Sequence, residues 1–214
     1  TVGNPRNWRK VIAVLEAGYN PMHVVATADP GKMAFTNFLD MNHGFATLEV
    51  TKDDPTDFKA TIRSVSLKLD TDLKYNLDIQ NARGLAVTPD LQYAFVSDWF
   101  VFDFPNRRLF RPTDPQDYAI LQGRGAKVGI IKDPFGPDPQ LVAATTPVLS
   151  GFADRMALSP DGKYLYVDFR GAGGLLSPRE VKVLDVEVIR ETLDKATAAD
   201  LDRLGKQPIE NLYP

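Results

Sequence analysis

The stretch Ala157-Leu-Ser-Pro-Asp-Gly-Lys-Tyr-Leu-Tyr-Val167 decides the fold of this 214-residue chain. A short apolar run leads into Ser159-Pro-Asp-Gly162, in which proline presets φ, aspartate can bond its own backbone and glycine supplies a positive φ. A second run, Tyr164-Leu-Tyr-Val167, follows the turn. Two apolar runs around such a turn predict a β-hairpin. Because the second run is apolar at consecutive positions, we expect its strand to be covered on both faces.

The same unit occurs three times in the chain. Segments 23–37, 83–97 and 154–168 align without a gap, with turns at Asp29-Pro-Gly31, Thr88-Pro-Asp90 and Ser159-Pro-Asp-Gly162. A third strand is expected after each hairpin, at 45–50, 127–131 and 181–186, and fourth strands at 61–69 and 141–145. Four antiparallel strands per repeat predict the blades of an all-β propeller. Residues 9–16 would then form the outer strand of a preceding blade.

The visible repeats supply about three to four blades, whereas closed propellers need at least about four. The copies also lie farther apart in the sequence than ordinary propeller repeats of roughly 40 to 50 residues. An open arc would leave a sheet face uncovered. We therefore expect an incomplete part of a larger propeller, with the other blades on a longer parent polypeptide or on a partner. The alternative is a small closed propeller with one blade hidden in the irregular stretches.

The chain divides into two predicted parts. Residues 1–188 would form the blades, and residues 189–214 a C-terminal helix and tail. The tetrad Thr197-Ala-Ala-Asp200 resembles a capping box, and Gly205 can end a turn, so a short helix is expected near 198–204.

Several motifs of the sequence resemble those of a known family. The phrases Gly84-Leu-Ala-Val-Thr-Pro-Asp90 and Ala157-Leu-Ser-Pro-Asp-Gly-Lys-Tyr-Leu-Tyr-Val167 resemble the bacterial YVTN-type repeats of YncE-like and surface-layer-type β-propellers. The tetrad that names the family is only approximated, as Phe35-Thr-Asn-Phe, Phe95-Val-Ser-Asp and Tyr166-Val-Asp-Phe. This resemblance implies an extracytoplasmic propeller, commonly a binding module and sometimes a lactonase-like or metal- or haem-bearing enzyme.

The amino-acid composition excludes several classes of binding partner and cofactor. The chain has 25 basic and 28 acidic residues, a net charge of -3, so it offers no polycationic surface for nucleic acid. It has no cysteine, which removes thiolate nucleophiles, Cys-ligated zinc and disulfides and suits a periplasmic or secreted protein. No apolar run approaches the roughly 20 residues that span a bilayer. We expect no nucleic-acid partner, no membrane span and no cofactor.

Four polar residues are expected at the mouth of the propeller channel. The repeat alignment places His23, Arg83 and Asp154 at equivalent positions, at the start of the innermost strand of each blade, with Arg155 one step on. Convergent polar groups around a concave opening are typical of a ligand site. The alternative is that these residues only solvate the end of the channel.

Catalytic and metal patterns are weak. The chain has two histidines, so a site of three His is excluded, and the only metal candidates are His23, His43 and Asp40. Because His43 lies in an Asn-His-Gly turn, simple exposure explains it, and we expect no metal. There is no Gly-x-Ser-x-Gly elbow, and the sequence names no catalytic residue.

A long insertion, residues 99–125, interrupts the middle blade. It combines aromatic and arginine side chains, which are typical of interface hot spots. The candidate partner-binding residues are Trp99, Phe102, Phe104, Arg107, Arg108, Phe110 and Arg111. The alternative is that the insertion folds over its own blade or a neighbouring subunit.

Two hypotheses for function follow. The first is a non-enzymatic propeller module of a larger extracytoplasmic protein, which contacts a partner through the insertion and the channel mouth. That partner would be another protein or the other blades of the parent, and a homo-oligomer is left open. The second is a propeller enzyme, either a lactonase-like hydrolase or a His-ligated metal-dependent oxidoreductase, with His23 at the mouth.

Overall fold

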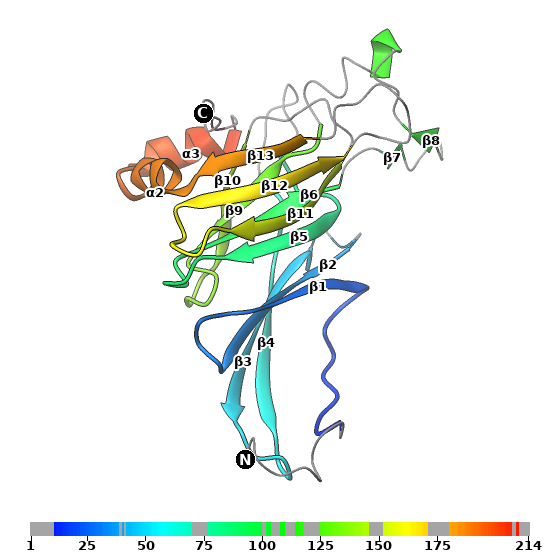
Figure 1. Cartoon of the computed structure of the whole chain (residues 1–214), viewed down its shortest axis with the longest axis vertical. Helices are drawn as coiled ribbons and strands as arrows, with labels where there is room; N and C mark the ends of the chain where they lie inside the picture. Colours follow the sequence, from blue (N-terminus) through cyan, green and yellow to red (C-terminus); the bar gives the residue numbers. More distant parts are fainter. Residues whose placement is uncertain are drawn as a thin grey trace.

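Three antiparallel sheets that follow one another along the chain, and a small two-stranded sheet, are seen in the computed structural model (Figure 1). We call them blades 1, 2 and 3. The structure describes residues 11–38, 40, 42–69, 77–99, 102–103, 108–109, 114–117, 125–145, 152–170, 180–206 and 209.

The strands run outward from the innermost strand of each blade. Blade 1 has the order β1 (Pro21–Ala26), β2 (Lys32–Asn37), β3 (Phe45–Lys52) and β4 (Lys59–Val65). Blade 2 consists of β5 (Ala82–Val87), β6 (Tyr93–Asp98), β9 (Val128–Lys132) and β10 (Gln140–Ala144). Blade 3 consists of β11 (Phe152–Leu158), β12 (Tyr164–Arg170) and β13 (Glu180–Asp185). Within the insertion, β7 (Phe102–Asp103) pairs with β8 (Arg108–Leu109).

The chain is thus a partial β-propeller, as the repeats predict. All three hairpins and all three third strands form, and β4 and β10 are the two expected fourth strands. Blade 3 has three strands within the described residues. The division of the chain between residues 188 and 189 stays a prediction.

The strand predicted at 9–16 is wrong over its described part. Residues 11–17 belong to no sheet, although alternate side chains face the protein. Leu15 and Ala17 pack on a cluster centred on Phe35 and Leu48 of blade 1. The segment therefore covers the face of blade 1 through its side chains and does not form the outer strand of a preceding blade.

A hydroxyl at the head of each hairpin turn sets the register of the repeats. Thr27 Oγ1 lies 2.9 Å from the Lys32 carbonyl oxygen, and the Tyr93 N–H donates to Thr88 Oγ1 at 3.0 Å. The Tyr164 N–H donates to Ser159 Oγ at 3.0 Å. Thr27, Thr88 and Ser159 are therefore structurally equivalent.

This equivalence shifts the first copy of the repeat by one residue relative to the other two, compared with the gapless sequence alignment. The ladders agree with it, because Val24, Leu85 and Met156 occupy the same place opposite Phe35, Val96 and Val167. The sequence alignment had matched Gly31 of the first turn with Gly162 of the third. The structure matches the aspartates two residues after the hydroxyl, whose carboxylates accept N–H groups at Gly31, Gln92 and Lys163.

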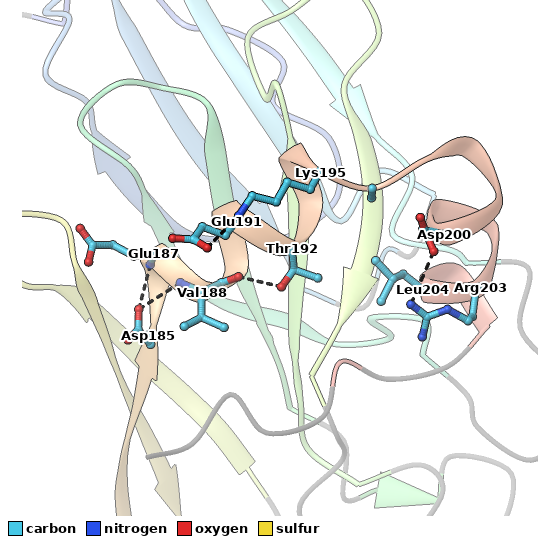
Figure 2. A pocket seen from close by; sticks show the side chains of 10 residues that line it. Asp185, Glu187, Val188, Glu191, Thr192, Lys195, Asp200, Arg203 and Leu204 are labelled. Carbon is cyan, nitrogen blue, oxygen red and sulfur yellow. Dashed lines mark hydrogen bonds and ion pairs between the residues drawn. The ribbon is translucent and has the colours of Figure 1, made fainter.

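Two helices follow blade 3 (Figure 2). Helix α2 (Val186–Asp194) begins at an Asp185 cap, whose carboxylate accepts the N–H groups of Glu187 and Val188 at 2.9 and 3.1 Å. Helix α3 (Ala198–Lys206) begins at the expected capping box, in which Thr197 and Asp200 bond each other reciprocally. The prediction of a helix near 198–204 is confirmed.

Helix α2 is fastened to blade 2 rather than to the solvent side of blade 3. Arg190 Nη1 lies 2.6 Å from Asp90 Oδ2, and the Tyr93 hydroxyl donates to Asp194 Oδ1 at 2.6 Å. Burial and the Asp194 carboxylate both raise the pKa of Tyr93 far above its ordinary value, so this hydroxyl stays a donor.

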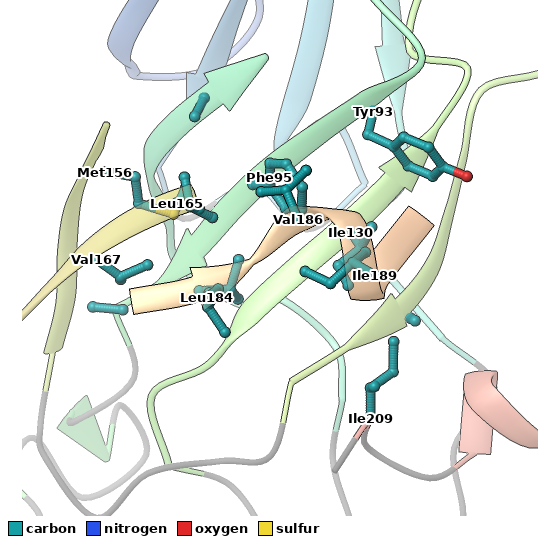
Figure 3. Packing of buried hydrophobic residues seen from close by; sticks show 14 of the residues in the cluster. Tyr93, Phe95, Ile130, Met156, Leu165, Val167, Leu184, Val186, Ile189 and Ile209 are labelled. Carbon is teal, nitrogen blue, oxygen red and sulfur yellow. The ribbon is translucent and has the colours of Figure 1, made fainter. Parts of the chain in front are cut away.

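The main apolar core lies between blades 2 and 3 (Figure 3). Tyr93 and Phe95 of β6 face Leu165 and Val167 of β12 across this joint. Helix α2 closes one end of it with a small set of buried side chains, Val186, Ile189 and Leu193. A second cluster joins blades 1 and 2 in the same way, with Ala34, Phe45 and Val65 packed against Leu85, Ala94 and Val96.

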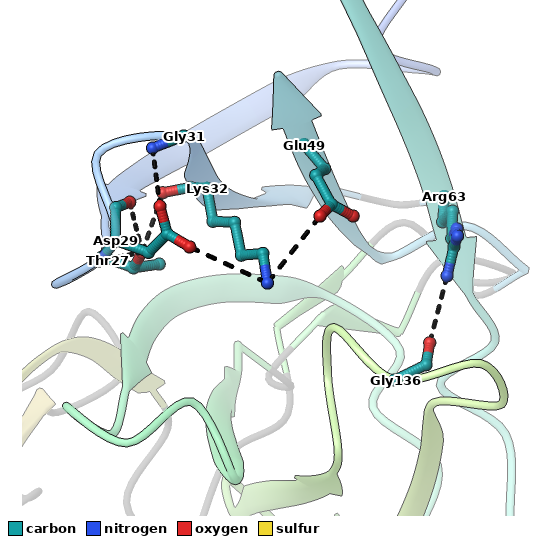
Figure 4. A network of polar contacts seen from close by, with 7 residues as sticks. All are labelled: Thr27, Asp29, Gly31, Lys32, Glu49, Arg63 and Gly136. Atoms are coloured by element: carbon teal, nitrogen blue, oxygen red, sulfur yellow. Dashed lines mark hydrogen bonds and ion pairs between the residues drawn. The ribbon is translucent and has the colours of Figure 1, made fainter. Parts of the chain in front are cut away.

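Polar contacts surround the joint between blades 1 and 2 (Figure 4). Lys32 Nζ lies 3.8 Å from Asp29 and 3.7 Å from Glu49, both within blade 1. It also lies 5.7 Å from the ring centroid of Phe135, which follows β9 of blade 2. Arg63 on β4 donates to the Gly136 carbonyl at 3.1 Å. Because exposed ion pairs of this kind contribute little, the apolar clusters decide the stability of the joint.

Buried hydroxyls on the second strands of blades 1 and 2 bind the innermost strand of the next blade. Thr36 of blade 1 donates to the Arg83 carbonyl of blade 2 at 2.9 Å. The equivalent residue of blade 2, Ser97, donates to the Asp154 carbonyl of blade 3 at 3.2 Å and accepts the Gly84 N–H at 2.7 Å. A Cβ atom at Gly84 would clash with the Asp154 carbonyl oxygen and lie 2.7 Å from Ser97 Oγ.

We expect Gly84→Ala to lower the free energy of unfolding by about 1 to 3 kcal/mol, because the backbone of β11 must move to admit a methyl group. Gly31→Ala is the matched control, since a Cβ atom there meets only Asp29 Oδ1 at 3.4 Å. The control should change stability by less than about 0.5 kcal/mol. Urea unfolding followed by circular dichroism measures both, and equal effects would contradict the close approach of the strands.

Candidate ligand site at the axial mouth

A cavity of about 250 Å³ opens where the innermost strands of the three blades meet. Its lining comes from every blade: Met22 and His23 from β1, Arg83 from β5, and Asp154 and Arg155 from β11. The structure therefore brings His23, Arg83, Asp154 and Arg155 together around one opening.

A β-bulge in each inner strand aims these side chains. The ladder shifts between Pro21 and His23 in β1, between Ala82 and Leu85 in β5, and between Ala153 and Met156 in β11. The lining residues of blades 2 and 3 lie within these interruptions. Bulges bend a strand and redirect its side chains, and they are frequent beside functional sites.

The corrected register changes which of these residues correspond. His23 is equivalent to Gly84 and Arg155, while Met22 is equivalent to Arg83 and Asp154. The sequence alignment paired His23 with Arg83 and Asp154, which is wrong by one residue, and it missed Met22. The shared Thr/Ser-x-Asp pattern of the turns was the signal that could have found the correct register.

Arg83 is held on two sides. Its Nε pairs with Asp154 Oδ1, and the Asp154 side chain is only 4% exposed. Its guanidinium carbon lies 4.6 Å from the ring centroid of Trp99, which in turn meets Phe38 edge-on at 5.5 Å between ring centroids. Ion pairing and stacking on an aromatic face both restrict the guanidinium group. Arg83 and Asp154 thus form a fixed, internally neutralised wall of the cavity.

The other two polar groups are not neutralised in this way. Arg155 is exposed, and within the part of the chain that the structure describes it makes no ion pair or hydrogen bond. His23 is partly buried. Burial, followed by the positive charge of Arg155, lowers the pKa of His23, and the Asp154 carboxylate opposes this shift. The cavity therefore has one surplus positive charge and a neutral imidazole at neutral pH.

The insertion residues lie mostly outside the described part of the chain. This holds for Phe104, Arg107, Phe110 and Arg111, while Phe102 and Arg108 are placed only as members of β7 and β8. Trp99 is half-buried beneath Arg83, and its backbone N–H donates to the Asn81 carbonyl at 3.0 Å. Trp99 thus supports the axial mouth, and partner binding by the insertion stays a prediction.

The candidate metal ligands do not form a cluster. His43 Nδ1 lies 3.2 Å from Asp40 Oδ2 in an exposed turn, whereas His23 lines the axial cavity. Among the described residues, no group of three or more His, Asp or Glu side chains is placed to hold a metal ion.

A larger hollow of about 530 Å³ lies between α2 and α3 (Figure 2). Its acidic groups already have structural partners: Asp185 caps α2, Asp200 caps α3, and Glu191 pairs with Lys195 at 3.0 Å. Ordinary helix capping and pairing account for this arrangement.

Comparison with known proteins supports the fold. The chain resembles Kuenenia stuttgartiensis hydrazine synthase with a TM-score of 0.52 and 19% identity over 92% of this chain and 49% of that one. A putative 6-phosphogluconolactonase from Bacteroides fragilis matches with a TM-score of 0.44 and 16% identity over 77% of this chain and 34% of that one. No family model and no curated protein matches the chain. The likeness to hydrazine synthase concerns the fold alone.

The chain spans half or less of these similar structures, 34% of the lactonase chain and 49% of the hydrazine synthase chain. Within the described residues, none of the helices has the length and apolar character needed to cross a bilayer.

The lowered pKa of His23 predicts a pH-dependent stability. Below about pH 6.5 the unfolded chain takes up a proton at this histidine more readily than the folded chain. The contribution of His23 is therefore fully present above that pH and is lost as the pH falls through it. We expect His23→Gln to reduce the loss of unfolding free energy between about pH 7.5 and 5.5.

Arg155→Gln is the matched control, because it removes a charge that lowers the His23 pKa while keeping the histidine. It should also flatten the profile, but less than His23→Gln. Urea unfolding across the pH range measures this, and a profile unchanged by either variant would contradict the assigned electrostatics.

Proposed function

We propose that this chain is a non-enzymatic binding module whose axial mouth receives an anionic group, a carboxylate or a phosphate, of a small ligand or of a partner. The observation that carries the proposal is the cavity lined by the Arg83–Asp154 pair, Arg155 and His23. Such a concave site, with a few convergent polar groups supplied by several strands, is the usual form of a ligand site.

The charges of the lining favour an anion. Asp154 already shares its charge with Arg83, so an entering anion meets the unpaired Arg155 instead of a free carboxylate. A guanidinium group binds carboxylate and phosphate oxygens with strong charge-assisted hydrogen bonds. An anion beside His23 would also offset the nearby positive charge and raise the pKa of its imidazole. Binding would then be accompanied by proton uptake.

We also propose the wider setting of this module. The YVTN-like phrases and the blade architecture support membership of that class of repeats. The absence of cysteine supports a periplasmic or secreted location. In this setting the chain belongs to a larger protein, and the aromatic and arginine residues of the insertion contact a partner.

The described residues of the cavity give the enzymatic alternative little support. The described lining of the cavity consists of Met22, His23, Arg83, Asp154 and Arg155, which include no hydroxyl or amine nucleophile. The Asp154 carboxylate is engaged by Arg83, so it is not free to act as a general base.

Titration with succinate and with inorganic phosphate, followed by NMR of the His23 ring protons, tests the proposal. We expect saturable shifts with at least one anion and tighter binding at about pH 6 than at pH 8, because protonated His23 adds a second positive charge. Arg155→Ala should weaken binding about tenfold or more, the value of a charge-assisted hydrogen bond.

Lys163→Ala is the control, because Lys163 is an exposed cation on the same blade, in the turn at the other end of the β11–β12 hairpin. It should bind like the wild type. The proposal fails if neither anion shifts the His23 resonances, or if Arg155→Ala and Lys163→Ala behave alike.

A further inference from the structure

A fully buried ion pair lies at the root of the insertion in blade 2. Asp98 Oδ2 and Lys127 Nζ are 2.6 Å apart, and their side chains are 0% and 1% exposed. Asp98 ends β6 directly before the insertion, and Lys127 lies between the insertion and β9. The Asp98 N–H also donates to the Lys127 carbonyl at 2.9 Å. A main-chain bond and a side-chain pair therefore hold the two ends of the insertion together.

The same carboxylate holds the entry to β5. Asp98 Oδ1 accepts the N–H groups of Gln80 and Asn81 at 3.1 and 3.0 Å. The next residue but one, Arg83, is the second residue of β5. The Asn81 carbonyl in turn accepts the backbone N–H of Trp99 at 3.0 Å. Both supports of Arg83, its own strand and the Trp99 ring beneath it, are thus adjacent to groups that Asp98 binds.

The blade itself does not require a charged pair at this place. The ladders make Asn37 of blade 1 and Phe169 of blade 3 the equivalents of Asp98, and all three residues are 0% exposed. In blade 1 the neutral amide of Asn37 donates to the His43 carbonyl at 2.8 Å. Among these three equivalent positions, only the one in blade 2, which supplies Arg83, carries a charge.

The energetics of buried ion pairs favour a positioning role over a stabilising one. Withdrawing two charges from water costs free energy that their attraction largely offsets, so such a pair adds little stability over apolar side chains of similar volume. Phe169 demonstrates that an apolar side chain can fill this place in a blade. Displacement of either charged partner, however, leaves the other charge buried and uncompensated. The pair therefore favours one geometry of the groups around it.

We propose that the Asp98–Lys127 pair positions the axial site, because it holds Trp99 and the start of β5 where they keep the Arg83 guanidinium on Asp154. The pair acts through Arg83 and does not touch the ligand. Its function is to keep the wall of the cavity neutral, which a site for anions requires.

Removal of the pair has two consequences for the cavity. Arg83 is released from the Asp154 carboxylate, whose negative charge then faces the opening. That charge repels an entering anion, and it also favours the protonated form of His23, since Asp154 already acts to raise the pKa of this imidazole. The effect on anion binding rests on the proposed function, whereas the effect on His23 does not.

The double variant Asp98→Asn, Lys127→Met tests the proposal, because it replaces both charges with neutral groups of similar size and leaves no unpaired buried charge. We expect a protein that is folded by circular dichroism and whose His23 ring titrates with a higher pKa than in the wild type, measured by NMR. Succinate or phosphate, whichever binds the wild type, should bind about three- to tenfold more weakly, because the contact with Arg155 remains.

Leu193→Ala is the matched control for a general loss of stability. It removes a buried side chain of α2, the helix that binds blade 2 at the turn end of its first hairpin, opposite the axial mouth. This variant should keep the wild-type His23 pKa and the wild-type affinity for the anion.

Trp99→Leu is a second test, which leaves the buried pair in place. Loss of the aromatic face beneath Arg83 should raise the His23 pKa in the same direction, while Trp99→Phe, which keeps a ring there, should stay close to the wild type. A wild-type His23 pKa in Trp99→Leu overturns the proposal, and so does a folded double variant with a wild-type His23 pKa. A wild type that binds neither anion, together with a raised His23 pKa in the double variant, would refute the proposed function and support the positioning role.

Discussion

The close approach of the innermost strands near the axis is the constraint on which the rest of the structure depends. Thr36 and Ser97 each donate a hydroxyl hydrogen bond to a carbonyl of the next blade, and Gly84 leaves no Cβ atom in the gap. These contacts fix the angle between successive blades near the channel, and at Gly84 they leave no room for a side chain. The apolar clusters then fill the wedge that opens outward between the sheets. The axial cavity exists because three strands converge under this constraint.

Local chemistry made most of the fold predictable from the sequence. The turn residues predicted each hairpin, and consecutive apolar positions indicated the strands that pack between sheets. The same local signals failed where contacts with distant parts of the chain decide whether a segment forms a strand. Residues 11–17 form an apolar run that predicted a strand, yet they cover a blade face without joining a sheet.

The residues of the candidate ligand site could be predicted from the sequence, but their geometry could not. The repeats place polar residues at the starts of the inner strands, which was enough to name His23, Arg83, Asp154 and Arg155. The bulges that aim them depend on the pairing of whole strands, and no short motif encodes them. The stacking of Arg83 on Trp99 joins the inner strand of blade 2 to the residue that follows its second strand. Sequence alone therefore assigned Trp99 to partner binding, whereas the structure also gives it a role beneath the cavity.

The fastening of helix α2 has a mechanical consequence. Arg190 and Asp194 bind Asp90 and Tyr93, so the chain that leaves blade 3 is anchored on blade 2. A pulling force applied at the C-terminus is therefore transmitted first to the middle of the arc, and β13 is shielded from being peeled away strand by strand. Blades 2 and 3 should therefore yield together as one cooperative unit.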